Sequence, residues 1–256
     1  MIKFFRKIRQ NMITENRASK YLLYAFGEII LVVIGILIAL YLNNKQEVYS
    51  IQKQQENYLR QIKGEMENNL KSLAIEEKDL SQKMEHAIKV LNIMSNDSLI
   101  DNLSETEISS LINGFLITDI VLFYEDGALN QIIYSGGLKE IKNDSISSLL
   151  ASWEGKINRV RLQEEQVAAG QENLIHYVYQ HGNFRNLSDD LGYSKELGIA
   201  MSEHKKGNKH LFRSKEYENY IFQFVGFGYS LQNREYPNFK KDIQLLITLI
   251  DKELKD

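Results

Sequence analysis

The strongest pattern in the sequence is an uninterrupted apolar stretch near the N-terminus. Residues 21–42 contain one charged side chain, Glu28, in twenty-two positions. At about 1.5 Å of rise per residue this stretch is about 33 Å long, enough to cross the hydrocarbon core of a bilayer. It exceeds the apolar core of a signal peptide, and bulky Tyr41 and Leu42 stand where a peptidase needs small side chains. The pattern therefore predicts an uncleaved transmembrane helix.

From Asn43 onward, apolar residues recur at steps of three and four, with one step of seven across Glu76 and Glu77. Such steps place side chains on one face of a helix, and their average of about 3.5 residues is typical of a coiled-coil seam. We expect a helix over about 43–95, whose seam must be covered by this chain or another. The seam residues are Leu59, Ile62, Met66, Leu70, Leu73, Leu80, Met84, Ala87, Leu91 and Met94.

Turn and capping signals divide the next part of the chain into shorter elements. Residues 95–102 have turn chemistry, and Ser104 and Glu107 have the spacing of a capping box that opens a short helix. Residues 116–124 are apolar and β-branched, which favours a brief extended segment. A second short helix is expected over about 125–134.

The C-terminal half predicts two further long helices. Gly136-Gly137 is suited to a left-handed helix end, and residues 143–144 supply the cap of a helix running to about residue 181. Residues 182–213 are rich in glycine and charge and predict an irregular segment. The last helix begins near Ser214, and Pro237 either kinks it or restarts it in a first turn. The aromatic alternation at 220–229 also fits a strand, but the three-to-four spacing on both sides favours helix.

Together these elements predict an all-α chain: a transmembrane helix continuing toward a long coiled-coil-like helix, then an elongated helical bundle. Charge adds an orientation. Residues 1–20 hold six basic residues and one acidic residue, whereas residues 43–256 hold 25 basic and 32 acidic residues. Positive residues beside a span stay in the cytoplasm. We therefore expect a cytoplasmic head at 1–20, a span at 21–42 in a bacterial inner membrane, and a periplasmic domain at 43–256.

The basic head has a second possible task. Lys3, Arg6, Lys7 and Arg9 surround an apolar face, as in a short amphipathic helix lying on an anionic inner leaflet. A plain topology signal is the alternative, because the charges alone suffice for orientation.

Four blocks of the sequence span essentially the whole chain: "MIKFFRKIRQ", "SKYLLYAFGEIILVVIGILIAL" with Asn43-Asn44, "LNQIIYSGGLKEIKNDSISSLL" and "YENYIFQFVG…LLITLIDKELK". In these blocks the chain resembles a family of uncharacterised single-span membrane proteins of the Bacteroidota, whose usual tryptophan after the paired asparagines is replaced here by Lys45. The resemblance implies a membrane anchor and a helical outer domain, and it implies no reaction.

The sequence predicts no catalytic, cofactor or metal site. There is no cysteine and no H-E-x-x-H motif, and the "GFGYS" stretch at 226–230 lacks the third glycine of a dinucleotide fingerprint. His204 and His210 lie among lysines that repel a cation. The carboxylates of Glu76, Glu77, Glu164 and Glu165 are interpreted as solvated helix faces.

Four aromatic residues offer a candidate ligand pocket. Trp153, Tyr134, Tyr177 and Tyr179 either line a small-molecule pocket between helices or form bundle core with polar tips reaching water. Nucleic acid is excluded as a partner because phosphate binding needs a basic surface, and residues 43–256 carry a net charge of −7.

The membrane span itself carries the remaining candidate site. Glu28, Val32, Gly35 and Ala39 fall on one stripe, and Gly35-x-x-x-Ala39 is a small-x-x-x-small step that lets helices approach closely. A carboxylate inside a membrane is expected to face a partner or a water-filled cavity. Glu28 therefore bonds within a homo-oligomer, pairs with a different membrane protein, or titrates in a proton path. The alternative is snorkelling toward the basic head.

Three functions follow as hypotheses. The first is a non-enzymatic, membrane-anchored scaffold or adaptor that associates with copies of itself or with another membrane protein. The second is a periplasmic sensor that signals through a partner, because twenty cytoplasmic residues hold no output domain. The third, by architectural analogy, is a single-span subunit of a proton-coupled complex that uses Glu28.

Overall fold

The computed structural model describes residues 18–116, 119–204 and 206–255 of the 256-residue chain. Lys3, Arg6, Lys7 and Arg9 lie outside these ranges, so their contact with the inner leaflet stays a prediction. The elements in these ranges are helices, with no strand among them, which confirms the all-α prediction. The chain divides into two compact units, Met1–Asn57 and Tyr58–Asp256, which are described separately below.

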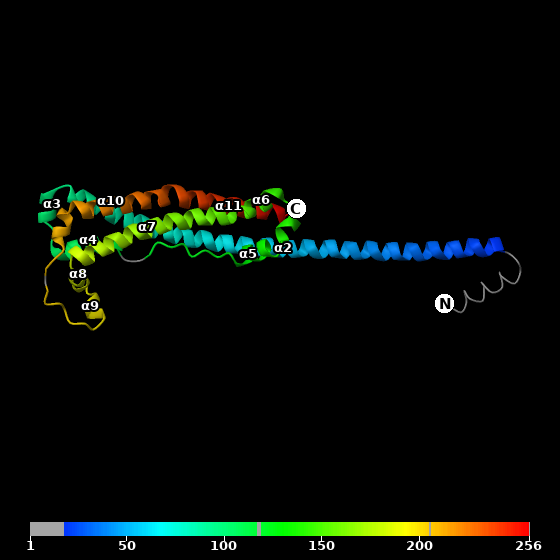
Figure 1. Cartoon of the computed structure of the whole chain (residues 1–256), viewed down its shortest axis with the longest axis horizontal. Coiled ribbons are helices and arrows are strands. Elements are labelled where there is room, and N and C mark those ends of the chain that lie inside the picture. The colour runs from blue at the N-terminus through cyan, green and yellow to red at the C-terminus, as the bar shows by residue number, and fades with distance from the viewer. Residues whose placement is uncertain (1–17, 117–118, 205, 256) are drawn as a thin grey trace. The chain divides into compact units, whose positions relative to one another are not determined.

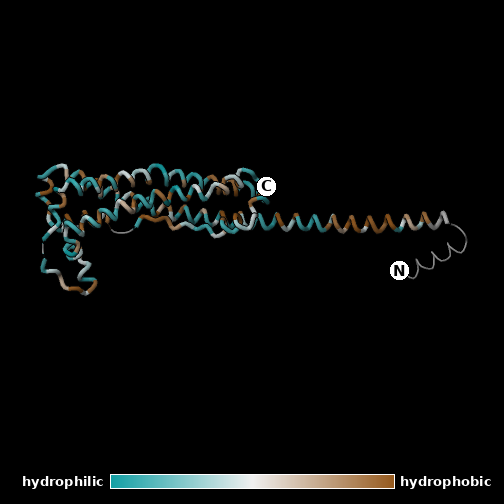
Figure 2. Tube along the Cα trace, viewed as in Figure 1, coloured by the Kyte–Doolittle hydropathy of each residue, from teal (hydrophilic) through white to brown (hydrophobic). Residues whose placement is uncertain are grey.

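The first unit contains the apolar stretch, which lies in helix α2 (Ala18–Met94). Among the residues that the structure covers, α2 is the one helix long and apolar enough to cross a membrane, and none of its apolar window is buried. Figure 2 shows the stretch as a continuous apolar run along the helix. The described side chains of residues 22–57 are all exposed or half-buried, and the first buried one is Leu59. The second unit begins at Tyr58, and the predicted division at Asn43 between the span and the outer domain stays a prediction.

The second unit is a bundle in which the rest of α2 packs with the long helices that follow (Figure 1). Two ion pairs fix the antiparallel register of α2 and the last helix: Lys63 with Asp251 at 2.6 Å, and Glu77 with Lys240 at 2.7 Å. The α-helices after α2 are α3 (Asp97–Asp101), α4 (Glu105–Leu116), α5 (Gly127–Tyr134), α6 (Asp144–Ala151), α7 (Trp153–His181), α8 (Phe184–Asp190), α9 (Tyr193–Glu196), α10 (Lys215–Ser230) and α11 (Tyr236–Glu253). The short η elements are η1 (Gly137–Glu140), η2 (Lys209–Arg213) and η3 (Leu231–Glu235).

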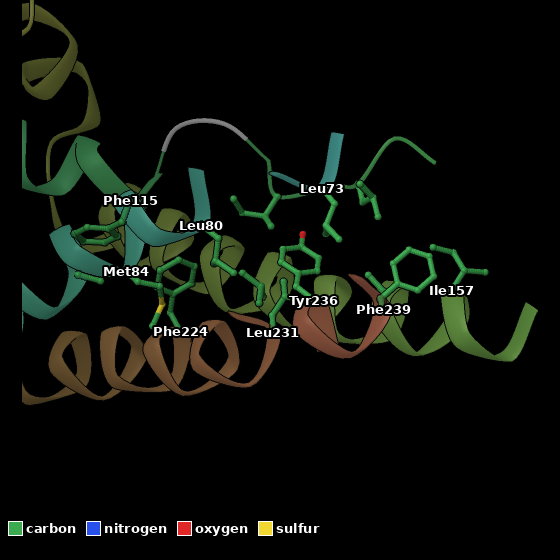
Figure 3. Packing of buried hydrophobic residues seen from close by; sticks show 14 of the residues in the cluster. Leu73, Leu80, Met84, Phe115, Ile157, Phe224, Leu231, Tyr236 and Phe239 are labelled. Carbon is green, nitrogen blue, oxygen red and sulfur yellow. The ribbon is translucent and has the colours of Figure 1, made fainter. Parts of the chain in front are cut away.

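The core lies along the seam of α2, which is covered by helices of the same chain. Leu80 and Met84 of α2 lie close to Phe224 and Leu231, and Leu73 lies opposite Tyr236 (Figure 3). Burial of such side chains stabilises the fold by about 1.5–3 kcal/mol each. The predicted seam is thus occupied within the second unit by this chain's own helices, which answers how a helix of this length is stabilised.

Several local predictions are confirmed by hydrogen bonds. The capping box forms, because the Ser104 backbone N–H donates to the Glu107 carboxylate at 2.8 Å and the Glu107 N–H donates to the Ser104 hydroxyl at 3.2 Å. Gly136 has a φ of 79°, the left-handed conformation expected there. Asn143 accepts hydrogen bonds from Ser145 N–H and Ile146 N–H at the start of α6.

The C-terminal helical prediction also holds. Residues 220–229 are helical, and Pro237 lies in the first turn of α11, directly after the π-helical turn η3. The chain stays helical from α10 through η3 into α11, so Pro237 follows a π-helical turn and not a loop.

Three predictions need correction. The helix predicted over 143–181 is divided at Ser152, whose hydroxyl donates to the Leu149 carbonyl at 2.9 Å and so competes with the helical pattern. The turn predicted at 95–102 contains the short helix α3, capped by Asn96. The segment 182–213, predicted to be irregular, contains α8, α9 and η2, because Asp189 accepts hydrogen bonds from Ser194 and Ser202 that fold it back on itself.

Candidate functional site

The most unusual part of the second unit is the non-helical segment 119–126 between α4 and α5, here called the strap. It runs alongside α2 and α7 in Figure 1. Its side chains alternate: Ile120 and Leu122 are buried, whereas Val121 is 43% and Phe123 is 79% exposed. Alternation with period two is that of an extended chain. Residues 119–124 of the predicted extended segment 116–124 are therefore extended in pattern, although they join no sheet, whereas Leu116 is the last residue of α4.

Because the strap pairs with no neighbouring strand, side chains must satisfy its backbone. On α2, the side-chain amide of Asn69 hydrogen-bonds both backbone groups of Glu125. Its Nδ2 donates to the Glu125 carbonyl and its Oδ1 accepts from the Glu125 N–H, both at 2.8 Å. Glu65, also on α2, accepts from the Ala128 N–H at 2.6 Å and the Leu129 N–H at 3.2 Å, where α5 begins. Asn69 is fully buried.

From α7, Glu164 holds the strap on its other side. One carboxylate oxygen accepts from the Leu122 N–H at 3.1 Å and from the Tyr236 hydroxyl at 2.7 Å. Gln171, two turns further along α7, donates to the Leu116 carbonyl at 2.8 Å at the end of α4. These bonds explain why polar side chains occupy buried positions on both long helices.

The interpretation of all four carboxylates as solvated helix faces is wrong for Glu164, which is 5% exposed. Burial raises the pKa of Glu164 above its ordinary value, and the hydrogen bonds from Tyr236 and Leu122 oppose this rise. Glu165 is exposed as expected, and Glu77 pairs with Lys240.

Two further charged residues of α2 lie near the strap: Glu76 is half-buried and Lys83 is buried. Burial and the nearby Asp79 carboxylate raise the pKa of Glu76, and Lys83 opposes that rise. Burial lowers the pKa of Lys83 to about 8, against the opposing charges of Asp119, Asp79 and Glu76. The carboxylate of Glu76 keeps one buried oxygen without a hydrogen-bond partner among the described atoms.

The sequence analysis missed Asn69 and Lys83 and interpreted Glu76 as a solvated residue, yet a signal was present. Glu76 falls in the seven-residue gap of the α2 seam, and Asn69 and Lys83 lie seven residues to either side of it. A seam position that turns polar for three consecutive heptads indicates packing against something other than an apolar helix face. The arrangement anchors the backbone of the strap and of the start of α5. Asn69 and Glu65 hydrogen-bond backbone groups within residues 125–129, and Glu164 accepts from the Leu122 N–H and from the Tyr236 hydroxyl.

Two hollows flank Arg161 next to the strap. One, of about 210 Å³, lies between α5 and α7 and is lined by Trp153, Tyr124 and Tyr134 among others. The other, of about 230 Å³, is lined mainly by Ile120, Val121, Leu122 and α7. The Trp153 indole donates a hydrogen bond to the Tyr124 hydroxyl, which ties the first hollow to the strap.

The four aromatic residues do not share one pocket, and the core alternative holds for Trp153 and Tyr177, which are buried, but not for Tyr134 and Tyr179, which are exposed. Trp153 and Tyr134 line the first hollow together. Tyr177 instead stacks on Tyr217 with ring centroids 5.3 Å apart and bonds Ser214 at 2.6 Å. Tyr179 stacks on Phe184 at 4.7 Å, beside a different hollow.

The histidines take part in backbone contacts. His210 Nε2 lies 2.7 Å from the His181 carbonyl oxygen, and His86 Nδ1 lies 2.8 Å from the Gln82 carbonyl oxygen. No group of three or more histidine, aspartate or glutamate side chains within residues 18–116, 119–204 and 206–255 is placed to hold a metal ion.

In the first unit, the predicted association face lies on α2. Glu28, Val32, Gly35 and Ala39 fall at helical spacings of four, three and four residues. Val32, Gly35 and Ala39 are exposed and Glu28 is half-buried. A Cβ added at Gly35 would meet no atom within 4 Å, so the helix surface is open at that position. The structure brings the four residues onto one stripe, and their role in association stays a prediction.

Comparison with known proteins adds no relative: no family model, no curated protein and no solved structure matches the chain. The resemblance to the Bacteroidota family of single-span membrane proteins stays a prediction.

Proposed function

We propose that the chain is a non-enzymatic scaffold or adaptor anchored in a bacterial inner membrane by residues 21–42. The observation that supports this most is the composition of α2. One helix contains both the unburied apolar stretch and the buried seam around which the second unit is built. A protein with this arrangement holds its folded domain at a membrane through a continuous run of helix. The basic head is proposed to stay in the cytoplasm and residues 43–256 to be periplasmic.

Association within the membrane is proposed to use the stripe of Glu28, Val32, Gly35 and Ala39. Small residues let two backbones approach closely, which gives van der Waals contact where lipid offers no hydrophobic driving force. A carboxylate on the same stripe gains a hydrogen bond across the contact, which offsets part of the cost of placing it in hydrocarbon. A second copy of the chain is the simplest partner, because each copy presents the same small surface.

Replacing Gly35 by leucine is expected to reduce self-association in the membrane by about tenfold or more, equal to ~1.4 kcal/mol. The added side chain would keep the two backbones apart. The chain lacks cysteine, so Leu42→Cys at the outer end of the stripe permits disulfide cross-linking between copies in native membranes. The measurement is the cross-linked fraction with and without Gly35→Leu.

Gly27→Leu is the matched control. Gly27 lies in the same apolar stretch, also has open space around its Cβ position, and falls about 100° away from Glu28 around the helix. Cross-linking should survive Gly27→Leu. Equal loss in both variants, or no change with Gly35→Leu, would contradict the proposed face; no cross-linking in the parent would contradict self-association.

The orientation has its own test. A reporter that is active only in the periplasm, fused after Asp256, should be active, because the net charge of +5 in residues 1–20 retains the head in the cytoplasm. Replacing four of the six basic head residues by glutamine should lower that activity. Activity of a cytoplasm-specific reporter at the same fusion site would overturn the orientation.

A further inference from the structure

The hollow between α5 and α7 has an apolar wall and a polar rim. Its wall includes Trp153 and Ile157, which are buried, and the half-buried Tyr124. Trp153 is held in place by its bond to Tyr124 and by the ring of Phe239, 5.8 Å away. A rigid wall of this kind is typical of small-molecule sites, which combine apolar surface with a few placed polar groups.

The rim is made of five polar side chains that line the hollow. Within residues 18–116, 119–204 and 206–255 none of the five side chains makes a hydrogen bond or an ion pair. Two of them lie four residues apart at the N-cap and in the first half of α5, and three lie at steps of four and three on α7, spacings that place side chains on one face of a helix. They are Asp126 and Asn130 at the start of α5, and Glu154, Asn158 and Arg161 on α7.

The rim carries both signs of charge. Arg161 presents a planar guanidinium, which suits a carboxylate because two N–H donors can bind its two oxygens. Asp126 and Glu154 present carboxylates, which suit an ammonium group. These rim carboxylates differ from those of Glu65 and Glu164, which already accept hydrogen bonds from backbone N–H groups or from a hydroxyl.

We propose that this hollow binds one free amino acid with an apolar or aromatic side chain. Arg161 takes the carboxylate, Asp126 or Glu154 takes the ammonium, and the side chain lies against Trp153 and Tyr124. The volume of about 210 Å³ is below the ~300–1,000 Å³ of sites for larger ligands, which matches a molecule of this size. This ligand site goes beyond the scaffold function and does not depend on the membrane face.

The test uses the full chain in mild detergent with L-leucine and L-phenylalanine as probes. Trp153 is the chain's one tryptophan and lines the hollow, so its fluorescence reports binding there directly. We expect a saturable change with a Kd of roughly 1 μM to 1 mM. Arg161→Gln should weaken binding by about tenfold or more, because the carboxylate loses its cation.

Arg60→Gln is the matched control, since Arg60 is an exposed residue of α2 that does not line the hollow. It should bind as the parent does, and far-UV circular dichroism should show all variants folded. N-acetyl-phenylalanine and phenylalaninamide each lack one charge and should bind at least about tenfold more weakly. A leucine dipeptide tests whether the ligand is a free amino acid or a peptide.

Three results would overturn the proposal. One is no saturable response to either amino acid. Another is binding of N-acetyl-phenylalanine as tight as that of phenylalanine, which would remove the role of Asp126 and Glu154. The third is equal weakening by Arg161→Gln and Arg60→Gln, which would indicate a general charge effect. Cross-linking through Leu42→Cys tests the membrane face separately, so failure of one proposal leaves the other standing.

Discussion

Replacing Glu164 by alanine is expected to lower the free energy of unfolding of the second unit by about 3 kcal/mol. The substitution leaves two buried donors, the Leu122 N–H and the Tyr236 hydroxyl, without their acceptor. Each buried group left unpaired costs about 1–3 kcal/mol. The measurement is chemical unfolding of the full chain in detergent, followed by the fluorescence of Trp153, which lies in the second unit.

Glu165→Ala is the control for this prediction. Glu165 is the exposed neighbour on the same turn of α7, so its loss should change the free energy of unfolding by less than about 0.5 kcal/mol. Equal effects at the two positions would contradict the anchoring role of Glu164.

Glu164→Gln separates the charge from the hydrogen bonds. The pKa of Glu164 is raised in the folded state above the ordinary value of 4.5. Its contribution to stability is therefore full below about pH 4.5 and is lost as pH rises through the folded pKa. Acidification from neutral pH toward 4.5 should stabilise the parent relative to Glu164→Gln, which has no such titration. Parallel pH profiles of the two proteins would contradict a raised pKa.

Features decided by nearby residues were predictable from the sequence. The apolar stretch, the capping box of Ser104 and Glu107, the left-handed Gly136 and the Asn143 cap each depend on residues within one turn of one another. The α2 helix was also predictable, because the three-to-four spacing of its apolar residues repeats over many turns. Local rules failed at Ser152, where one hydroxyl bond to Leu149 divides a helix whose periodicity continues on both sides.

The strap was not predictable in the same way, because its contacts join distant positions. Glu164 bonds residues 42 positions before it and 72 positions after it. The heptad pattern of α2 indicated the strap indirectly. One heptad position is apolar in its first and last repeats and polar in the three repeats between them. That position holds, in order, Ile62, Asn69, Glu76, Lys83 and Val90.

The candidate sites show the same limit. Grouping Trp153 with Tyr177 failed because 24 positions on one helix separate them by about 36 Å. The polar rim of the hollow had no sequence signal, because Asp126 and Asn130 on α5 meet Arg161 on α7 only in the fold. The stripe of the membrane segment, by contrast, follows from helical spacing alone.

Replacing Asn69 by alanine is expected to lower the free energy of unfolding by about 2–4 kcal/mol. The amide of Asn69 pairs with both the N–H and the carbonyl of Glu125 at 2.8 Å, as a neighbouring strand would. Alanine leaves both backbone groups unpaired, and water cannot replace the amide because the Asn69 side chain is fully buried. Because Asn69 is the anchor of the strap on α2, the effect should be local first. Amide hydrogen exchange in residues 119–126 should become faster before global unfolding is detected.

Asn68 provides a control one residue away. It is exposed and donates to the Glu125 side chain at 3.0 Å, so Asn68→Ala removes a bond to the same residue without exposing its backbone. Its effect should stay below about 0.5 kcal/mol, because water replaces that bond. If Asn68→Ala and Asn69→Ala accelerate exchange equally, the strap is not held through its backbone. If only Asn69→Ala accelerates exchange, the strap is held on α2 by the pairing of the Asn69 amide with the Glu125 backbone.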